Sequence, residues 1–126
     1  MKDALLAARR DRPFALLSGF DRTLGRDIAL GVDGGVSGIA ACAPEAMLDL
    51  YRAARSGNVA AAETAQTRVN ALIDRLDQFP APIGIRLALE ARGLPVGHHA
   101  IPLARETAPA AREFAMWFEK WLAGSG

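Results

Sequence analysis

Apolar residues are distributed along this chain in two different ways. Two short runs, Phe14–Ser18 and Val36–Ala41, are apolar along most of their length, and the first lies between a proline and a glycine. This pattern is typical of buried strands in a parallel sheet, although glycine weakens the second run. Elsewhere, apolar residues recur at spacings of three and four, which indicates helices with one buried face. The pattern predicts two strands within a mostly helical chain.

The helices are marked by their apolar stripes and by proline or glycine at their ends. Asp21 is placed to cap the helix that follows the first strand, and Pro44 suits the first turn of a later helix. In chain order, the expected helices are Lys2–Arg10, a short one carrying Leu24 and Ile28, one from Pro44 with Met47, Leu50, Tyr51 and Ala54, one over Val59–Phe79 with Val69, Leu72, Ile73 and Leu76, one with Ile85, Ala88 and Leu89, and a last one with Phe114, Trp117, Phe118, Trp121 and Leu122.

Strands that alternate with helices indicate parallel β/α units with right-handed crossovers. We therefore expect Phe14–Ser18 and Val36–Ala41 to be adjacent parallel strands. Two strands do not form a stable sheet alone, and strands that are apolar on both faces need cover on both sides. The sequence has the character of the end of a larger fold.

Composition excludes several classes of protein. Hydrophobic residues make up 51% of the 126 residues, which rules out a disordered tail, and the net charge of +1 argues against a basic nucleic-acid binder. No apolar stretch approaches the ~20 residues that cross a bilayer, and Arg9, Arg10 and Arg12 interrupt any secretory signal. The single cysteine, Cys42, fits a reducing compartment and a buried packing role. We expect a soluble cytoplasmic protein that binds neither nucleic acid nor membrane.

Five short segments follow one another in a characteristic order and spacing: Leu16–Asp21, Leu30–Gly38, Ala53–Asn58, Pro82–Leu89 and Ile101–Leu103. Together they resemble the C-terminal part of the dihydrodipicolinate synthase and N-acetylneuraminate lyase family, over nearly the whole chain. Arg22 stands where the family usually has an acidic residue, Arg86 where it often has lysine, and Ala100 where it often has a basic residue.

The resemblance implies an α/β fold, mostly helical, that is the C-terminal fragment of an eight-stranded TIM barrel with a three-helix extension. Phe14–Ser18 would be strand seven and Val36–Ala41 strand eight. Residues 1–58 would end the barrel, and residues 59–126 would form the extension. If either strand segment proved helical, we would expect the resemblance to fail. A full barrel typically needs ~250 residues.

Members of this family are lyases and synthases of the class I aldolase type, which hold pyruvate or another 2-oxo acid as a Schiff base on a lysine. The only lysines here are Lys2 and Lys120. We expect Lys2 to lie in a helix too close to strand seven to end strand six, and Lys120 to be exposed. Tyr51, the only tyrosine, belongs to an apolar stripe. The catalytic residues are therefore expected to be absent and the isolated chain inactive.

The resemblance places four residues at the rim of a substrate pocket. Gly19 and Asp21 follow strand seven, where the sialic-acid-lyase branch contacts the hydroxylated tail of its substrate. Ser37 and Gly38, on strand eight, would lie near the pyruvate end. Two other interpretations stay open: Asp21 as a helix cap, and Ser37 and Gly38 as small packing residues.

Neither a metal nor a dinucleotide is indicated, and we expect no cofactor. His98 and His99 are adjacent and cannot share one helical face, and the glycines at 31, 34, 35 and 38 lack the dinucleotide spacing. Two functions remain. The resemblance implies that the chain is part of a Schiff-base lyase or synthase that takes a 2-oxo acid when the barrel is complete. Alternatively, it is a non-catalytic truncated product that self-associates as a homo-oligomer or pairs with a partner chain.

Overall fold

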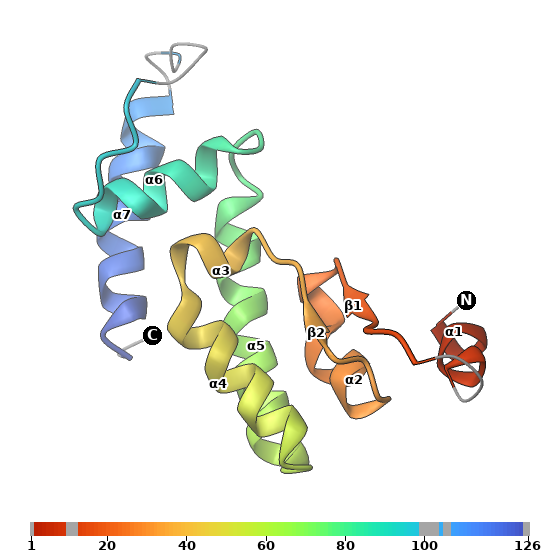
Figure 1. The fold of residues 1–126 in the computed structure, drawn as a ribbon. Helices are drawn as coiled ribbons and strands as arrows, with labels where there is room; N and C mark the ends of the chain where they lie inside the picture. The colour runs from red at the N-terminus through yellow and green to blue at the C-terminus, as the bar shows by residue number, and fades with distance from the viewer. Residues whose placement is uncertain (1, 10–12, 99–103, 105–106, 125–126) are drawn as a thin grey trace.

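The computed structural model describes residues 2–9, 13–98, 104 and 107–124. A small two-stranded sheet and the first helix lie on one side of the molecule, and the longer helices lie on the other (Figure 1). The elements are α1 (Lys2–Ala8), β1 (Leu17–Ser18), the short 3-10 helix η1 (Asp21–Thr23), α2 (Leu24–Ala29), β2 (Gly34–Gly35), α3 (Ile39–Cys42), α4 (Pro44–Arg55), α5 (Val59–Leu76), α6 (Ile83–Ala91) and α7 (Thr107–Leu122).

The two strands are neighbours and run parallel, as predicted. Leu17 pairs with Gly34 and Ser18 with Gly35. Backbone hydrogen bonds continue the pairing beyond the strands, from Asp33 N to Leu16 O at 2.9 Å and from Val36 N to Ser18 O at 2.9 Å. The first strand lies inside the predicted segment but keeps only its last two residues.

The prediction of a strand over Val36–Ala41 is wrong. The second strand is Gly34–Gly35, and Ile39–Cys42 forms helix α3. Glycine suits this strand because a Cβ on Gly35 would lie 3.0 Å from Leu24 Cδ1, so a larger residue would meet α2. After it, Ser37 Oγ accepts a hydrogen bond from Ala40 N at 3.0 Å, which supports a helical turn over alanine-rich sequence.

The helical body, which we define as α3 to α7, follows the sequence pattern closely. Pro44 occupies the first turn of α4, as predicted, and the Asn58 side chain accepts a hydrogen bond from Ala61 N at the start of α5. The predicted stripe of α5 is buried: Val69, Leu72, Ile73 and Leu76. Leu24 and Ile28 of α2 join the same core. One core therefore connects the segment from β1 to β2, which we call the strand region, to the helices.

Aromatic residues of α7 form the far end of this core. Phe118 is fully buried and stacks on Phe114 at 5.6 Å and on Trp121 at 5.8 Å between ring centroids. Arg68 of α5 covers the Trp121 ring at 4.6 Å and donates to its carbonyl oxygen at 2.7 Å. The prediction that these aromatics serve core packing is confirmed for the three buried rings.

The strand region is held to α1 by polar contacts. Arg9 Nη2 donates to Asp33 Oδ1 at 2.6 Å, and the other carboxylate oxygen of Asp33 accepts from Leu16 N at 2.7 Å. The Arg9 hydrogen bond is the main cause that lowers the pKa of Asp33. None of the described helices is both long enough and apolar enough to span a membrane.

Several apolar side chains near the strands are exposed. Leu17 is 53% exposed, Phe20 57% and Val36 68%. We call these three residues the exposed apolar group. Large apolar side chains in this number around so small a sheet are usually covered by further protein.

Candidate functional site

The two strands direct the loops that follow them toward one edge of the sheet. Gly19, Phe20 and Asp21 follow β1, and Val36, Ser37 and Gly38 follow β2. Because the strands are parallel, both loops leave at the carboxyl ends, where α/β folds build their binding sites. Gly19, Ser37 and Gly38 are therefore on loops at this edge, and Asp21 begins the short helix η1 directly after the first loop.

Asp21 does not cap a helix, so that alternative is wrong. Phe20 occupies the N-cap position of η1, and no side-chain hydrogen bond caps η1 or α2. Asp21 is the first residue of η1 and is half-buried. Its carboxylate makes no hydrogen bond or ion pair within the described part of the chain. It therefore remains available at the loop surface.

Ser37 and Gly38 lie between β2 and α3 and not on a strand, which corrects their expected placement. The Ser37 oxygen accepts from Ala40 N, which leaves its hydroxyl proton free to donate. A Cβ on Gly38 would lie 3.0 Å from Ile85 Cδ1 of α6. Glycine at this position thus allows the loop to lie close to α6. Gly19 is exposed with open space around it.

A buried polar pair beneath the first loop was not predicted. Ser18 and Asp27 are 7% and 2% exposed, and Ser18 Oγ donates to Asp27 Oδ2 at 2.7 Å. Thr23 Oγ1 donates to the same oxygen at 3.2 Å, and Phe20 N donates to Ser18 Oγ at 3.4 Å. The pair ties the end of β1 to α2. The signal in the sequence was an aspartate beside Ile28 on the apolar face of a short helix.

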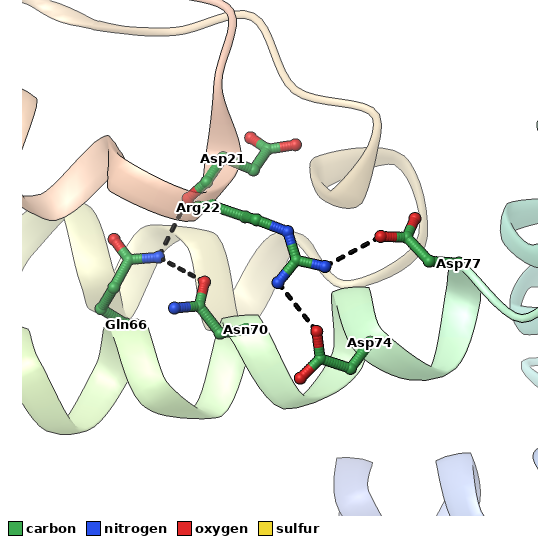
Figure 2. Close-up of polar contacts among 6 residues, drawn as sticks. All are labelled: Asp21, Arg22, Gln66, Asn70, Asp74 and Asp77. Carbon is green, nitrogen blue, oxygen red and sulfur yellow. Dashed lines mark hydrogen bonds and ion pairs between the residues drawn. The ribbon is translucent and has the colours of Figure 1, made fainter.

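The same loop is also anchored to α5, and sequence analysis missed this as well (Figure 2). Arg22 bridges to Asp74 and Asp77, with both nitrogen–oxygen distances at 2.8 Å. Gln66 Nε2 donates to Asp21 O at 2.9 Å, and its Oε1 accepts from Gly25 N at 2.9 Å. The two partners in each of these contacts are more than forty residues apart in sequence, so no local sequence motif predicts the contacts.

The nucleophile of a Schiff-base reaction is not placed at this edge by the residues that the structure describes. Lys2 is the first residue of α1, and its helical position was predicted. Lys120 is exposed on α7. Tyr51 is half-buried on α4 against the core. Cys42 is fully buried, and burial raises the pKa of its thiol to about 11. It is therefore a protonated packing residue at neutral pH.

A cavity lies beside the loop after β1. Its volume is about 710 Å³, and it lies between α2, the end of α4 and α5 and reaches the loop only at Arg22 and Thr23. Within the described ranges, no group of three or more His, Cys, Asp or Glu side chains could hold a metal ion. His98 lies in an exposed loop, whereas His99, Ala100 and Ile101–Leu103 lie outside the described residues.

Known proteins that match the chain agree with this architecture. The sequence model of the "Dihydrodipicolinate synthetase family" matches residues 4–118. The 4-hydroxy-tetrahydrodipicolinate synthase of Gluconacetobacter diazotrophicus is 34% identical over 119 residues, which are 94% of this chain and 39% of that protein. The corresponding protein of Azoarcus sp. is 37% identical over 98 residues, which are 78% of this chain and 34% of that protein.

Solved structures also align with most of this chain. Dihydrodipicolinate synthase from Bacteroides thetaiotaomicron matches with a TM-score of 0.80 at 22% identity, over 94% of this chain and 42% of that one. N-acetylneuraminate lyase from Fusobacterium nucleatum matches with a TM-score of 0.77 at 22% identity, over 93% and 40%. A prophage protein of Escherichia coli K12, solved in complex with pyruvate, matches with a TM-score of 0.74 at 25% identity, over 95% and 41%.

The chain thus spans about 40% of the length of the solved relatives that it matches. Its mostly helical fold with two parallel strands aligns with part of the barrel fold of that family. With a family match over residues 4–118 and an identity of 34% across most of its length, this chain belongs to the dihydrodipicolinate synthetase family, as a partial member.

Proposed function

We propose that this chain forms one wall of the substrate pocket of a pyruvate-dependent Schiff-base lyase or synthase. The observation that carries the proposal is the pair of loops at the carboxyl ends of two parallel strands, in a chain that belongs to this family. In the proposal, residues 1–58 end the barrel and residues 59–126 are its helical extension. A cytoplasmic location is part of the same proposal.

Each predicted site residue has a role in this pocket. The Asp21 carboxylate accepts hydrogen bonds from the aldehyde-derived part of the substrate, and the Ser37 hydroxyl donates one to the 2-oxo acid. Gly19 and Gly38 leave room for the substrate close to the backbone. The support is that three of them lie on the two loops and Asp21 directly after the first, with the Asp21 carboxylate unpaired among the described residues.

The nucleophile, in this proposal, comes from a part of the barrel that these residues do not provide. A Schiff-base lysine must be desolvated so that its pKa falls and a neutral amine is present near neutral pH. Lys120 is exposed, and Lys2 lies in helix α1. We therefore expect the isolated chain to be inactive in aldol cleavage and condensation.

Reductive trapping tests this proposal. The chain is incubated with pyruvate and borohydride, and its intact mass is measured beside that of Lys2→Ala. We expect no added mass on either, and no pyruvate release from 2-oxo-3-deoxy sugar acids. A barrel completed with the preceding β/α units should be labelled. An adduct on the isolated chain that disappears in Lys2→Ala would instead identify Lys2 as the Schiff-base residue.

The exposed apolar group favours a second candidate, a non-catalytic product that self-associates or pairs with a partner chain. Leu17, Phe20 and Val36 are each more than half exposed beside an open strand pair. Sedimentation should show a homo-oligomer, and Leu17→Ser with Val36→Ser should shift it toward monomer. The matched control is Leu48→Ser with Met116→Ser, at exposed positions of α4 and α7. A compact monomeric parent chain would contradict this candidate.

A further inference from the structure

Arg22 carries a positive charge directly beside Asp21, at the end of the loop after β1, and the structure shows what pairs with this charge. The guanidinium lies along α5 between Asp74 and Asp77 (Figure 2). These two hydrogen bonds raise the pKa of Arg22 further, with the Asp74 contact as the larger cause. The cation is therefore matched by two carboxylates before any substrate arrives.

Four polar side chains of α5 and its C-cap are aligned on one face of the helix; three of them contact the loop, and the fourth, Asn70, accepts a hydrogen bond from Gln66. Gln66, Asn70, Asp74 and Asp77 are separated by four, four and three residues, which is the spacing of helical neighbours. The buried stripe that begins at Val69 occupies another face. We call these four residues the polar stripe of α5. It is directed at the loop because the core fixes the rotation of the helix.

Gln66 fixes the loop backbone on both sides of Arg22. Its amide nitrogen donates to Asp21 O and to Asn70 Oδ1, at 2.9 and 3.0 Å. Its oxygen accepts from Gly25 N at the start of α2. An amide with both ends engaged holds one orientation, so the backbone from Asp21 to Gly25 is tied to α5.

Asp21 and Arg22, although adjacent, are directed differently. Figure 2 shows the Asp21 carboxylate pointing away from α5, whereas the Arg22 side chain lies along that helix. The Asp21 charge also helps to raise the pKa of the Cys42 thiol, although burial is the larger cause. Helix α3 follows the loop after β2, which carries Ser37 and Gly38.

We propose that Arg22 is a positioning residue, which the polar stripe of α5 holds so that the loop after β1 presents the Asp21 carboxylate and no free cation. The loop then disfavours a partner that directs a phosphate or carboxylate at this place, because the cation beside Asp21 is already paired. The statement that this loop faces a substrate rests on the proposed function. The contacts that hold the loop against α5 are independent of it.

The first test measures backbone amide exchange by NMR in the full chain. Arg22→Ala should accelerate exchange at Thr23, Leu24 and Gly25 about three- to tenfold, as expected for two exposed ion pairs. Arg22→Lys, which can engage only one carboxylate, should restore part of the protection. Arg26→Ala, at an exposed position of α2, is the matched control and should change little. Equal acceleration throughout the chain, or none, would overturn the positioning role.

The second test probes the charge of the loop with inorganic phosphate at constant ionic strength. Loop resonances of the parent chain should not shift, whereas Asp74→Asn with Asp77→Asn should free the guanidinium and make them shift. A phosphate response in the parent chain, or none in the double variant, would overturn the proposal. Both tests are independent of catalysis. If trapping on a completed barrel fails while these results hold, the proposed function fails and the positioning of the loop stands.

Discussion

The helical body and the strand region differ in how much of their apolar surface they cover themselves. Helices α4 to α7 bury Leu50, Leu72 and Phe118 almost completely. Beside the strands, Leu17 and Val36 are more than half exposed. The helices satisfy their own backbone hydrogen bonds and need only one neighbour, whereas each strand also needs partners along its edges. A fragment of a barrel can therefore retain a core in its helices while its strands stay short and uncovered.

The largest expected effect is in the aromatic end of the helical body. Phe118→Ala should lower the free energy of unfolding by about 3–5 kcal/mol, because it leaves a cavity between Phe114 and Trp121. Urea unfolding followed by tryptophan fluorescence measures it. Met116→Ala, at a 60% exposed position of the same helix, should cost less than about 0.5 kcal/mol. Similar losses in both variants would show that α7 is not packed as described.

A second prediction concerns Cys42, in α3 at the junction of the two regions. Its pKa in the folded chain is about 11, against 9.0 for the ordinary thiol. As pH rises above 9.0, the thiol of the unfolded chain ionises first, so stability is lost between pH 9 and 11. The loss should reach about 2 kcal/mol, allowing for partial solvation.

Cys42→Ala separates this effect from other groups that titrate in alkali. The difference in unfolding free energy between the parent chain and the variant should be constant below pH 8 and should fall between pH 9 and 11. A difference that stays constant through this range would mean that the thiol is solvated in the folded chain.

The contrast between the two regions also explains which parts of the fold could be predicted from the sequence. The stripe on α5 repeats over several turns, so its burial could be predicted from its spacing alone. The second strand could not, because its position depends on pairing with Leu17 and Ser18, which lie in another segment of the chain. The expectation that a helix in Val36–Ala41 would exclude the family was wrong. Two paired residues are enough to keep the strands parallel, and α3 begins after them.

The candidate site was predictable to a similar degree. Its residues could be located from the segments that resemble the family, but their hydrogen-bond and ion-pair partners could not be predicted. Arg22 was noted only as a departure, and its pairing with Asp74 and Asp77 depends on the packing of α5 against η1. The Ser18–Asp27 pair needed the fold to bring the strand end onto α2. Local patterns place residues on elements, and tertiary packing decides which side chains meet.

A third prediction tests the polar part of the strand region. Ser18→Ala should cost about 1–2 kcal/mol in unfolding free energy, because buried Asp27 loses one of its hydrogen-bond donors and keeps Thr23. Ser56→Ala, at an exposed position where Ser56 Oγ donates to Ala53 O, should cost much less. If the two substitutions cost the same in thermal and urea unfolding, the strand end is not anchored by its buried pair.

The smallest effect is expected at the surface of the helical body. There Arg92, the C-cap of α6, donates two hydrogen bonds to Glu45 of α4, at 2.6 and 3.0 Å. The Arg92 hydrogen bond is the main cause that lowers the pKa of Glu45, so the pair stabilises the fold above the ordinary carboxyl pKa and is lost as pH falls through the lowered one. Glu45 is 61% exposed, so Glu45→Gln should cost less than about 1 kcal/mol at pH 7. The variant should approach the parent chain in stability as the pH is lowered below 4, in parallel urea titrations. A loss that persists unchanged at low pH would mean that packing, and not the charge of this pair, joins α4 to α6.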